Sequence, residues 1–156
     1  MQPHPNVHAV QHALRSAEAH GQVRMLPEAV TTAAAAAAAL GVEVGQIANS
    51  LVFDADGDPL LVLTSGAHRV DTAKVAAIVG AATVRRATRE FVREHTGQTI
   101  GGVAPLGHPR PIRTIVDTAL ASHDVVWAAG GIPHAVFPTT FAELVVLTTG
   151  TPAEVA

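Results

Sequence analysis

Two apolar runs joined by a short polar turn constrain the fold of this chain more than any other feature. The runs IANSLVFD at 47–54 and PLLVLTS at 59–65 are separated by ADGD at 55–58, a pattern typical of a β-hairpin. The aspartates of DADGD at 54–58 also resemble a calcium loop. Because the glycine stands at the fourth place of this run and not at the sixth, we interpret the segment as a turn.

Helical and strand patterns alternate irregularly around this hairpin. Helices are predicted over 5–19, 33–39, 72–79, 88–95, 117–121 and from 139 or 140 to 147. Strands are predicted over 23–27, 82–87, 112–116, 124–131 and 134–138. The irregular order and the hairpin favour an α+β (mixed α/β) fold, with a mixed central sheet surrounded by helices, over a doubly wound one.

The length of 156 residues and the hydrophobic share of 48% predict one folded domain over 1–156, with an N-terminal helix within 1–22 and a core over 25–150. The absence of cysteine excludes disulfides, thiolate metal sites and a cysteine nucleophile. No apolar run approaches the roughly 20 residues of a membrane span. The first residues also lack the pattern of a signal peptide, so we expect a cytoplasmic protein without membrane contact.

Positive charge gathers in the middle of the chain. Eight of the ten lysines and arginines lie between positions 69 and 113, against three acidic residues, so this segment carries +5 in a chain of net charge −3. Such asymmetry marks either a surface for a polyanion or a set of solvated helix faces.

The stretch IGGVAPLGHP at 100–109 combines freedom with stiffness. Gly101 and Gly102 permit a positive φ or a close approach of another molecule, whereas Pro105 fixes its own φ. The stretch therefore suits a turn or a ligand cradle. Bare loops also stand at the ends of two other predicted strands, TSG at 64–66 and AGG at 129–131. We expect the three loops to converge on one pocket whose N–H groups stabilise developing negative charge.

Patterns for other catalytic sites are missing from the sequence. There is no G-x-S-x-G, no G-x-G-x-x-G and no Walker loop, so we expect no cofactor. His4, His8 and His12 share one predicted helix face but have no acidic or cysteine partner, and we expect no metal. His108 and His134 each follow a glycine-containing turn and would line one pocket if those turns meet.

Five segments follow one another in a recognisable order: ALGV at 39–42, IANSLVF at 47–53, LVLTSGAHRVD at 61–71, GGVAPLG at 101–107 and AGGIPHAVFPTTFAELVVLTTG at 129–150. This order resembles the YbaK/prolyl-tRNA-synthetase-associated domain family, whose members are trans-editing deacylases and the inserted editing domain of prolyl-tRNA synthetase. The resemblance implies a YbaK-like fold with a curved sheet. It also implies hydrolysis of the ester between a wrongly attached amino acid and tRNA, of the Cys- or Ala-tRNAPro class.

The resemblance also implies roles for individual residues. The G-x-x-P-L backbone positions the ester and its ribose, and the ribose 2′-hydroxyl helps the attacking water. We assign catalysis to Gly101, Gly102, Pro105 and Asn49. Substrate binding is expected of Ser50, Ser65, Gly66, Val103, Ala104, Leu106, Gly107, Gly130, Gly131 and His134. Contact with tRNA phosphates is expected of Arg69, Lys74, Arg86, Arg89 and Arg93. Expected partners are the aminoacylated end of tRNA and an aminoacyl-tRNA synthetase, but not DNA.

One residue departs from the family pattern. Members usually carry lysine in the segment K-[ST]-L-V, where this chain has Asn49 followed by Ser50. Asparagine offers a neutral donor and acceptor in place of a point charge. Two hypotheses therefore stay open, an active aminoacyl-tRNA deacylase and a catalytically silent module that binds aminoacyl-tRNA or a small ligand. A third is a pocket for a small metabolite, without any tRNA binding.

Overall fold

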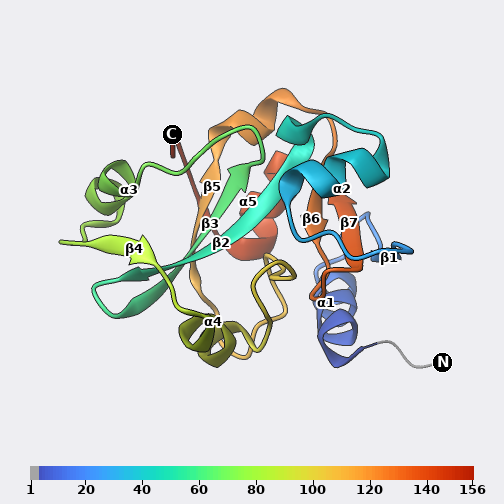
Figure 1. Cartoon of the computed structure of the whole chain (residues 1–156), viewed down its shortest axis with the longest axis horizontal. Helices are drawn as coiled ribbons and strands as arrows, with labels where there is room; N and C mark the ends of the chain where they lie inside the picture. Colours follow the sequence, from blue (N-terminus) through green and yellow to red (C-terminus); the bar gives the residue numbers. More distant parts are fainter. Residues whose placement is uncertain (1–3) are drawn as a thin grey trace.

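The computed structural model describes residues 4–156, which build one mixed sheet with helices on both faces (Figure 1). Its strands are β1 (Arg24–Met25), β2 (Ile47–Ala55), β3 (Asp58–Ser65), β4 (Val84–Arg86), β5 (Arg113–Asp117), β6 (Val126–Ala129), β7 (Ala135–Thr139) and β8 (Thr151–Ala153). The order is β1-β7-β6-β2-β3-β5-β8, and β4 pairs with β2 outside this path. Strand β3 is parallel to β5, β5 to β8 and β2 to β6, whereas the other pairs are antiparallel. The predicted fold class is confirmed.

The predicted hairpin forms the centre of the sheet. Strands β2 and β3 pair from Ala48↔Ser65 to Ala55↔Asp58, which leaves a turn of two residues. Both turn residues have positive φ, 52° at Asp56 and 95° at Gly57, as the commonest two-residue hairpin turn requires. Asp56 of the turn is engaged by main-chain groups, since its carboxylate accepts hydrogen bonds from the N–H groups of Ala82 and Thr83.

Most helices begin and end where side-chain caps and glycines predict. They are α1 (Pro5–Ser16), α2 (Ala33–Leu40), α3 (Thr72–Val79), α4 (Arg89–Thr96) and α5 (Phe141–Thr148), with short 3₁₀ turns η1 (Val44–Gln46) and η2 (Thr118–Ser122). Thr32 and Thr140 accept a backbone N–H at the starts of α2 and α5. Gly41 and Gly80 end α2 and α3 in the left-handed conformation.

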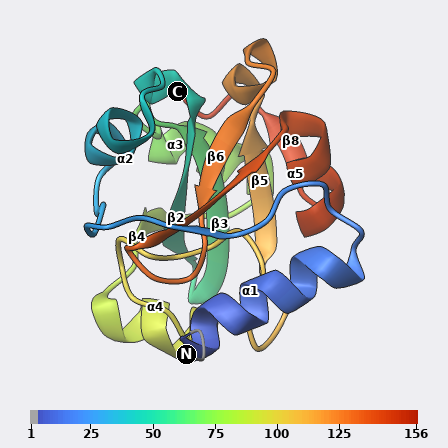
Figure 2. The ribbon, with the colours of Figure 1, turned by 90° about the vertical axis from the view of Figure 1, so that its right-hand side faces the viewer.

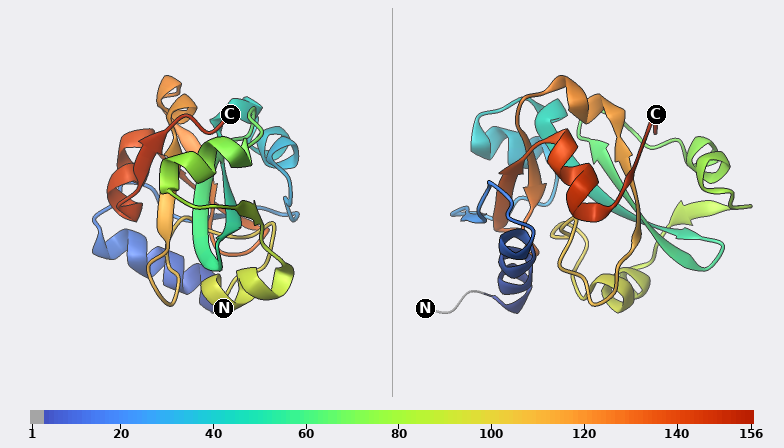
Figure 3. Two further views of the ribbon diagram at one scale, coloured as in Figure 1. Left: turned by 90° about the vertical axis from the view of Figure 1, so that its left-hand side faces the viewer. Right: turned by 180° about the vertical axis from the view of Figure 1, so that it is seen from behind.

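The helices divide between the two faces of the sheet. On one face, α1 and α5 contribute Val10, Leu14 and Leu144 to the largest buried cluster. On the other, α3 contributes Val75 to a second cluster and α2 contributes Ala36 to a third. Figure 2 shows α2 and α5 on opposite sides of the strands, and the rear view in Figure 3 shows α5 in front of them.

Several element boundaries differ from the sequence-based expectations. Helix α1 ends at Ser16 and not at 19, because Glu18 has a positive φ of 57°. The predicted helix at 117–121 is the 3₁₀ turn η2, and the strand expected from residue 134 begins at Ala135. Strand β8 was not predicted, since a three-residue strand containing Pro152 carries no alternating pattern of its own. Within residues 4–156, no helix has the length and apolar character needed to cross a membrane.

Burial on α5 generates a stability prediction. Leu144 is fully buried against the sheet, whereas Val146, two residues later on the same helix, is 77% exposed. Leu144→Ala is expected to lower the free energy of unfolding by about 2–5 kcal/mol, because it removes apolar contacts and leaves a cavity. Val146→Ala is the matched control and is expected to stay within about 0.5 kcal/mol of wild type. Urea denaturation measures both, and equal losses would contradict the assigned orientation of α5.

Candidate active site

The site starts from a break in strand pairing along one edge of β2. At its beginning, Ile47 and Ala48 pair with β6, and at its end Phe53 to Ala55 pair with β4. Figure 1 shows these two partners at opposite ends of β2. Residues 49–52 pair with β3 on one side but, among residues 4–156, have no strand partner on the other. The sheet is therefore open at this point.

A cavity of about 590 Å³ occupies this opening. Its volume lies within the range of small-molecule sites, roughly 300–1,000 Å³. The walls come from β2, α2, the segment before α2, the loop after β3, the end of β4, the loop 100–103, β6 and β7. Segments far apart in the sequence thus meet around the unpaired part of β2.

Asn49 and Ser50 both line this cavity. The Ser50 Oγ is buried and has no hydrogen-bond partner among residues 4–156. The peptide groups of β2 point alternately toward β3 and toward the open side. The Val52 carbonyl points to the open side, because it accepts a hydrogen bond from the Ala87 N–H there. Residues two apart present their peptide groups to the same side, so the Ser50 N–H and C=O also face the opening. Ser50 thus places three polar groups at the cavity, and buried groups of this kind require a partner.

Three residues of the glycine-rich loop at 100–109 line the cavity, namely Ile100, Gly101 and Val103. Gly101 has a φ of +94°, a conformation that favours glycine. Gly102 instead packs against the chain, since a Cβ added there would lie 2.8 Å from the Ile132 Cα. Gly102 therefore lets the loop approach the segment before β7, and its missing side chain serves packing.

The rest of this loop is held from outside the cavity. Ala104 is fully buried, and its N–H donates to the Gln98 Oε1 at 2.9 Å while its carbonyl accepts from the His108 Nε2 at 2.8 Å. Pro105 is buried, Leu106 packs against the main core, and Gly107 lies close to Val10 of α1. Burial lowers the pKa of His108, and the bond to the Ala104 carbonyl offsets this only in part.

The glycines of the loop at 129–134 also pack against neighbouring segments. A Cβ at Gly130 would lie 2.9 Å from the Ala135 Cβ, and one at Gly131 would lie 2.8 Å from the Asn6 carbonyl oxygen. His134 is exposed. Neither His134 nor His108 is among the residues that line the cavity. The two imidazoles therefore do not form the shared pocket that the sequence pattern suggested.

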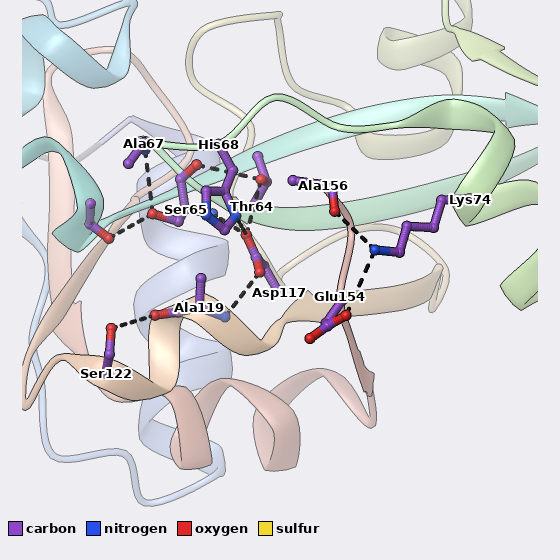
Figure 4. Close-up of polar contacts among 11 residues, drawn as sticks. Thr64, Ser65, Ala67, His68, Lys74, Asp117, Ala119, Ser122, Glu154 and Ala156 are labelled. Carbon is purple, nitrogen blue, oxygen red and sulfur yellow. Dashed lines mark hydrogen bonds and ion pairs between the residues drawn. The ribbon is translucent and has the colours of Figure 1, made fainter.

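In the loop after β3, the first residues pack against the chain, and later ones line the cavity. Ser65 is buried and its Oγ donates to the Gly45 carbonyl at 2.9 Å, so it fixes the loop and does not line the cavity. Gly66 packs against the Val44 carbonyl. The following His68 does line the cavity, and its Nδ1 lies 3.0 Å from the Oδ2 of Asp117 (Figure 4).

The five basic residues expected to meet tRNA separate into three groups. Arg69 and Arg86 line the main cavity. Arg89 and Arg93 border a second cavity of about 290 Å³, which shares Ile100 with the first. Lys74 lies apart, with its Nζ 2.9 Å from the Ala156 carbonyl oxygen and 3.7 Å from Glu154. Within residues 4–156, no group of three or more His, Cys, Asp or Glu side chains is arranged to hold a metal ion.

Comparison with known proteins identifies the family. The family model described as "Aminoacyl-tRNA editing domain" matches residues 27–147. The chain belongs to this family. The match includes the whole of β2, the glycine-rich loop and the Asp117 that holds His68.

Relatives with known structures or names agree with this assignment to the editing domain family. A crystal structure of a candidate trans-editing enzyme for prolyl-tRNA synthetase is 43% identical, covers 99% of this chain and 98% of that one, and superposes with a TM-score of 0.92. Proline–tRNA ligases of Maridesulfovibrio salexigens and Bacillus cereus are 30% and 35% identical over 58% and 53% of this chain. Each match spans only 15% of the ligase's length.

Sequence reasoning missed His68 and Asp117 as site residues of this editing domain. One signal was available, because His68 stands three residues after the apolar run ending at Ser65 and Asp117 directly follows the run ending at Val116. Carboxyl ends of parallel strands meet at one edge of a sheet. What the sequence did not reveal is that β3 and β5 are parallel neighbours.

The burial of His108 in this editing domain predicts that stability depends on pH. The unfolded chain binds a proton at His108 near the ordinary pKa of 6.5, whereas burial lowers the pKa in the folded state. Wild type should therefore lose stability as the pH falls below about 6.5. His108→Gln keeps a donor for the Ala104 carbonyl and should lose less over pH 7.5 to 5.5.

Urea denaturation at each pH measures this difference between wild type and His108→Gln. His12→Gln, on the exposed side of α1, is the control for removing a histidine. Parallel pH profiles for wild type and His108→Gln would contradict the assigned role of His108.

Proposed function

We propose that this editing domain hydrolyses the ester between a wrongly attached amino acid and the terminal adenosine of a tRNA. The carrying observation is the cavity at the unpaired part of β2, where Asn49, Ser50 and Gly101 meet. The family match over residues 27–147 and the similarity to a candidate trans-editing enzyme support the same reaction.

Ser50 and the glycine-rich loop are the groups that would hold the ester. The Ser50 C=O and Oγ can accept hydrogen bonds from the α-ammonium group of the amino acid, and its N–H can donate to a carbonyl oxygen. The Gly101 backbone lies on the same cavity without a side chain to block approach. The ribose 2′-hydroxyl next to the ester completes the arrangement, because it can orient the attacking water.

Substrates with small side chains suit this cavity best. Its walls include Ala33, Ala36 and Ala48, and its volume of about 590 Å³ must hold the amino acid together with the ribose. We propose alanyl- or cysteinyl-tRNAPro as the substrate class, which agrees with the names of the prolyl-tRNA-related relatives. A prolyl-tRNA synthetase is then the partner whose errors the domain corrects.

Asn49 favours a second candidate function, a silent module that binds aminoacyl-tRNA or a small ligand. Asparagine cannot supply the charge that lysine gives other family members at this position. The cavity does contain cations, because Arg69 and Arg86 line it. We therefore favour the active deacylase, with these guanidinium groups holding a phosphate of the tRNA end.

The substrate and the role of Asn49 are tested together. Wild type is expected to release amino acid from alanyl- or cysteinyl-tRNAPro faster than the no-enzyme control, and not from correctly charged tRNAs. Asn49→Lys is expected to raise kcat/KM about tenfold, because a charge-assisted hydrogen bond contributes about 1.5–3 kcal/mol. Val146→Lys, at an exposed position of α5, controls for the added charge. Activity that appears only in Asn49→Lys would make the silent module correct.

The basic residues outside the main cavity generate a prediction about tRNA binding. Arg89 and Arg93 stand one helical turn apart on α4 and are both exposed. Arg89→Glu and Arg93→Glu are each expected to weaken tRNA binding. Each should also reduce the slope of log Kd against the logarithm of the salt concentration by about one. Arg15→Glu on α1, which borders neither cavity, is the control. Binding curves that match wild type at low salt would remove α4 from the tRNA surface.

A further inference from the structure

His68 and Asp117 are brought together by two neighbouring parallel strands. Strands β3 and β5 pair through Leu63↔Val116, so their carboxyl ends lie at the same edge of the sheet. Asp117 is the last residue of β5, and His68 follows β3 by three residues. Figure 4 shows the imidazole of His68 beside the carboxylate of Asp117.

Asp117 is a buried carboxylate surrounded by donors. Its side chain is 2% exposed, and its Oδ2 accepts from the Ser65 N–H at 3.0 Å and from the Thr64 Oγ1 at 3.3 Å. Its Oδ1 accepts from the Ala119 N–H at 3.0 Å. Within residues 4–156 it forms no ion pair with lysine or arginine. Three donors hold this carboxylate without His68, so the fold of these loops does not depend on the imidazole.

The contact with Asp117 fixes which nitrogen of His68 carries hydrogen. A carboxylate oxygen can only accept, so the His68 Nδ1, at 3.0 Å from the Oδ2 of Asp117, donates. The neutral ring then has its lone pair on Nε2. Among residues 4–156, Nε2 has no hydrogen-bond partner, and the side chain is 38% exposed. Water and substrate can therefore reach it.

His68 is also distinct among the residues that line the main cavity. The charged side chains of the lining are Arg69, from the same loop as His68, and Arg86, from β4. Neither guanidinium accepts a proton in proteins. No lining residue is Asp, Glu, Lys, Cys or Tyr, so within the described chain only the imidazole of His68 offers the cavity a general base.

We propose that His68, oriented by Asp117, is the general base of the ester hydrolysis; this inference rests on the proposed function. Water attacks the ester carbonyl carbon while its proton moves to the His68 Nε2. The tetrahedral intermediate collapses, the bond between the carbonyl carbon and the ribose oxygen breaks, and that oxygen takes the proton back from Nε2. The products are the free amino acid and the tRNA with its terminal hydroxyl. Asp117 acts as a positioning residue, because it holds the ring in the tautomer with a free Nε2.

The first test measures the single-turnover rate of deacylation of alanyl-tRNAPro and cysteinyl-tRNAPro between pH 5 and 8.5. Wild type is expected to gain rate with pH and then reach a plateau, since only the neutral imidazole accepts a proton. His68→Gln is expected to lower the plateau rate about 10²- to 10³-fold and to abolish the acid limb. His12→Gln, an exposed histidine on α1 outside the cavity, should match wild type throughout.

A second variant examines the positioning role. Asp117→Asn replaces the carboxylate that accepts from Nδ1 by an amide that can also donate to it, so the ring is no longer held in one tautomer. The plateau rate should fall at least tenfold, while an acid limb remains because His68 is still present. Thermal unfolding of each variant shows whether it folds. If Asp117→Asn does not fold, the result for His68→Gln alone tests the general base. His68→Gln is expected to fold, because the His68 side chain is partly exposed and Asp117 keeps its other donors.

The outcomes separate this inference from the proposed function. An active wild type with a folded His68→Gln that keeps both its rate and its pH profile would make His68 a structural residue and leave the deacylase intact. A wild type that cleaves neither tRNA would overturn the proposed function and the general base together. Loss of rate and of the acid limb in His68→Gln, with His12→Gln unchanged, would support both.

Discussion

The divided edge of β2 is the constraint on which the rest of this structure depends. One strand pairs with β6 over its first two residues and with β4 over its last three, so its middle faces an opening. A polar peptide group at an unpaired edge is normally satisfied by water or by another chain. Here the edge lies inside the molecule, and the walls around it leave a cavity of about 590 Å³. An unpaired backbone thus becomes a binding surface.

The glycines around this opening act mainly by allowing close packing. Gly102 and Gly131 each lie where a Cβ would come within 2.8 Å of a neighbouring backbone atom. Their contacts fix the loops at 100–107 and 129–134 against each other and against the start of α1. The cavity wall therefore keeps its shape through backbone packing, and the hydrogen bonds on both sides of Ala104 add to this. Ile100, Gly101 and Val103 are the parts of the loop at 100–107 that face the cavity.

Local patterns predicted the elements of the fold, and tertiary pairing decided the site. The turn at 55–58, the alanine helix and the glycine caps could be found because each depends on residues close in sequence. The cavity position of Asn49 and Ser50 was expected from the family resemblance. By contrast, a bare sequence such as GGVAPLG gives no sign of which glycine packs and which faces a ligand. The pairing of His68 with Asp117 requires the parallel contact between β3 and β5, which no local pattern encodes.

The charges of the cavity divide the chemistry between two kinds of group. Arg69 and Arg86 give its lining a positive character, and the lining contains no carboxylate. This balance favours an anionic tRNA end and the negative charge that develops on an ester oxygen during attack. Asp117, which holds the Nδ1 of His68, is buried and is not among the residues that line the cavity. Asn49 adds a neutral donor and acceptor to this lining beside the two guanidinium groups.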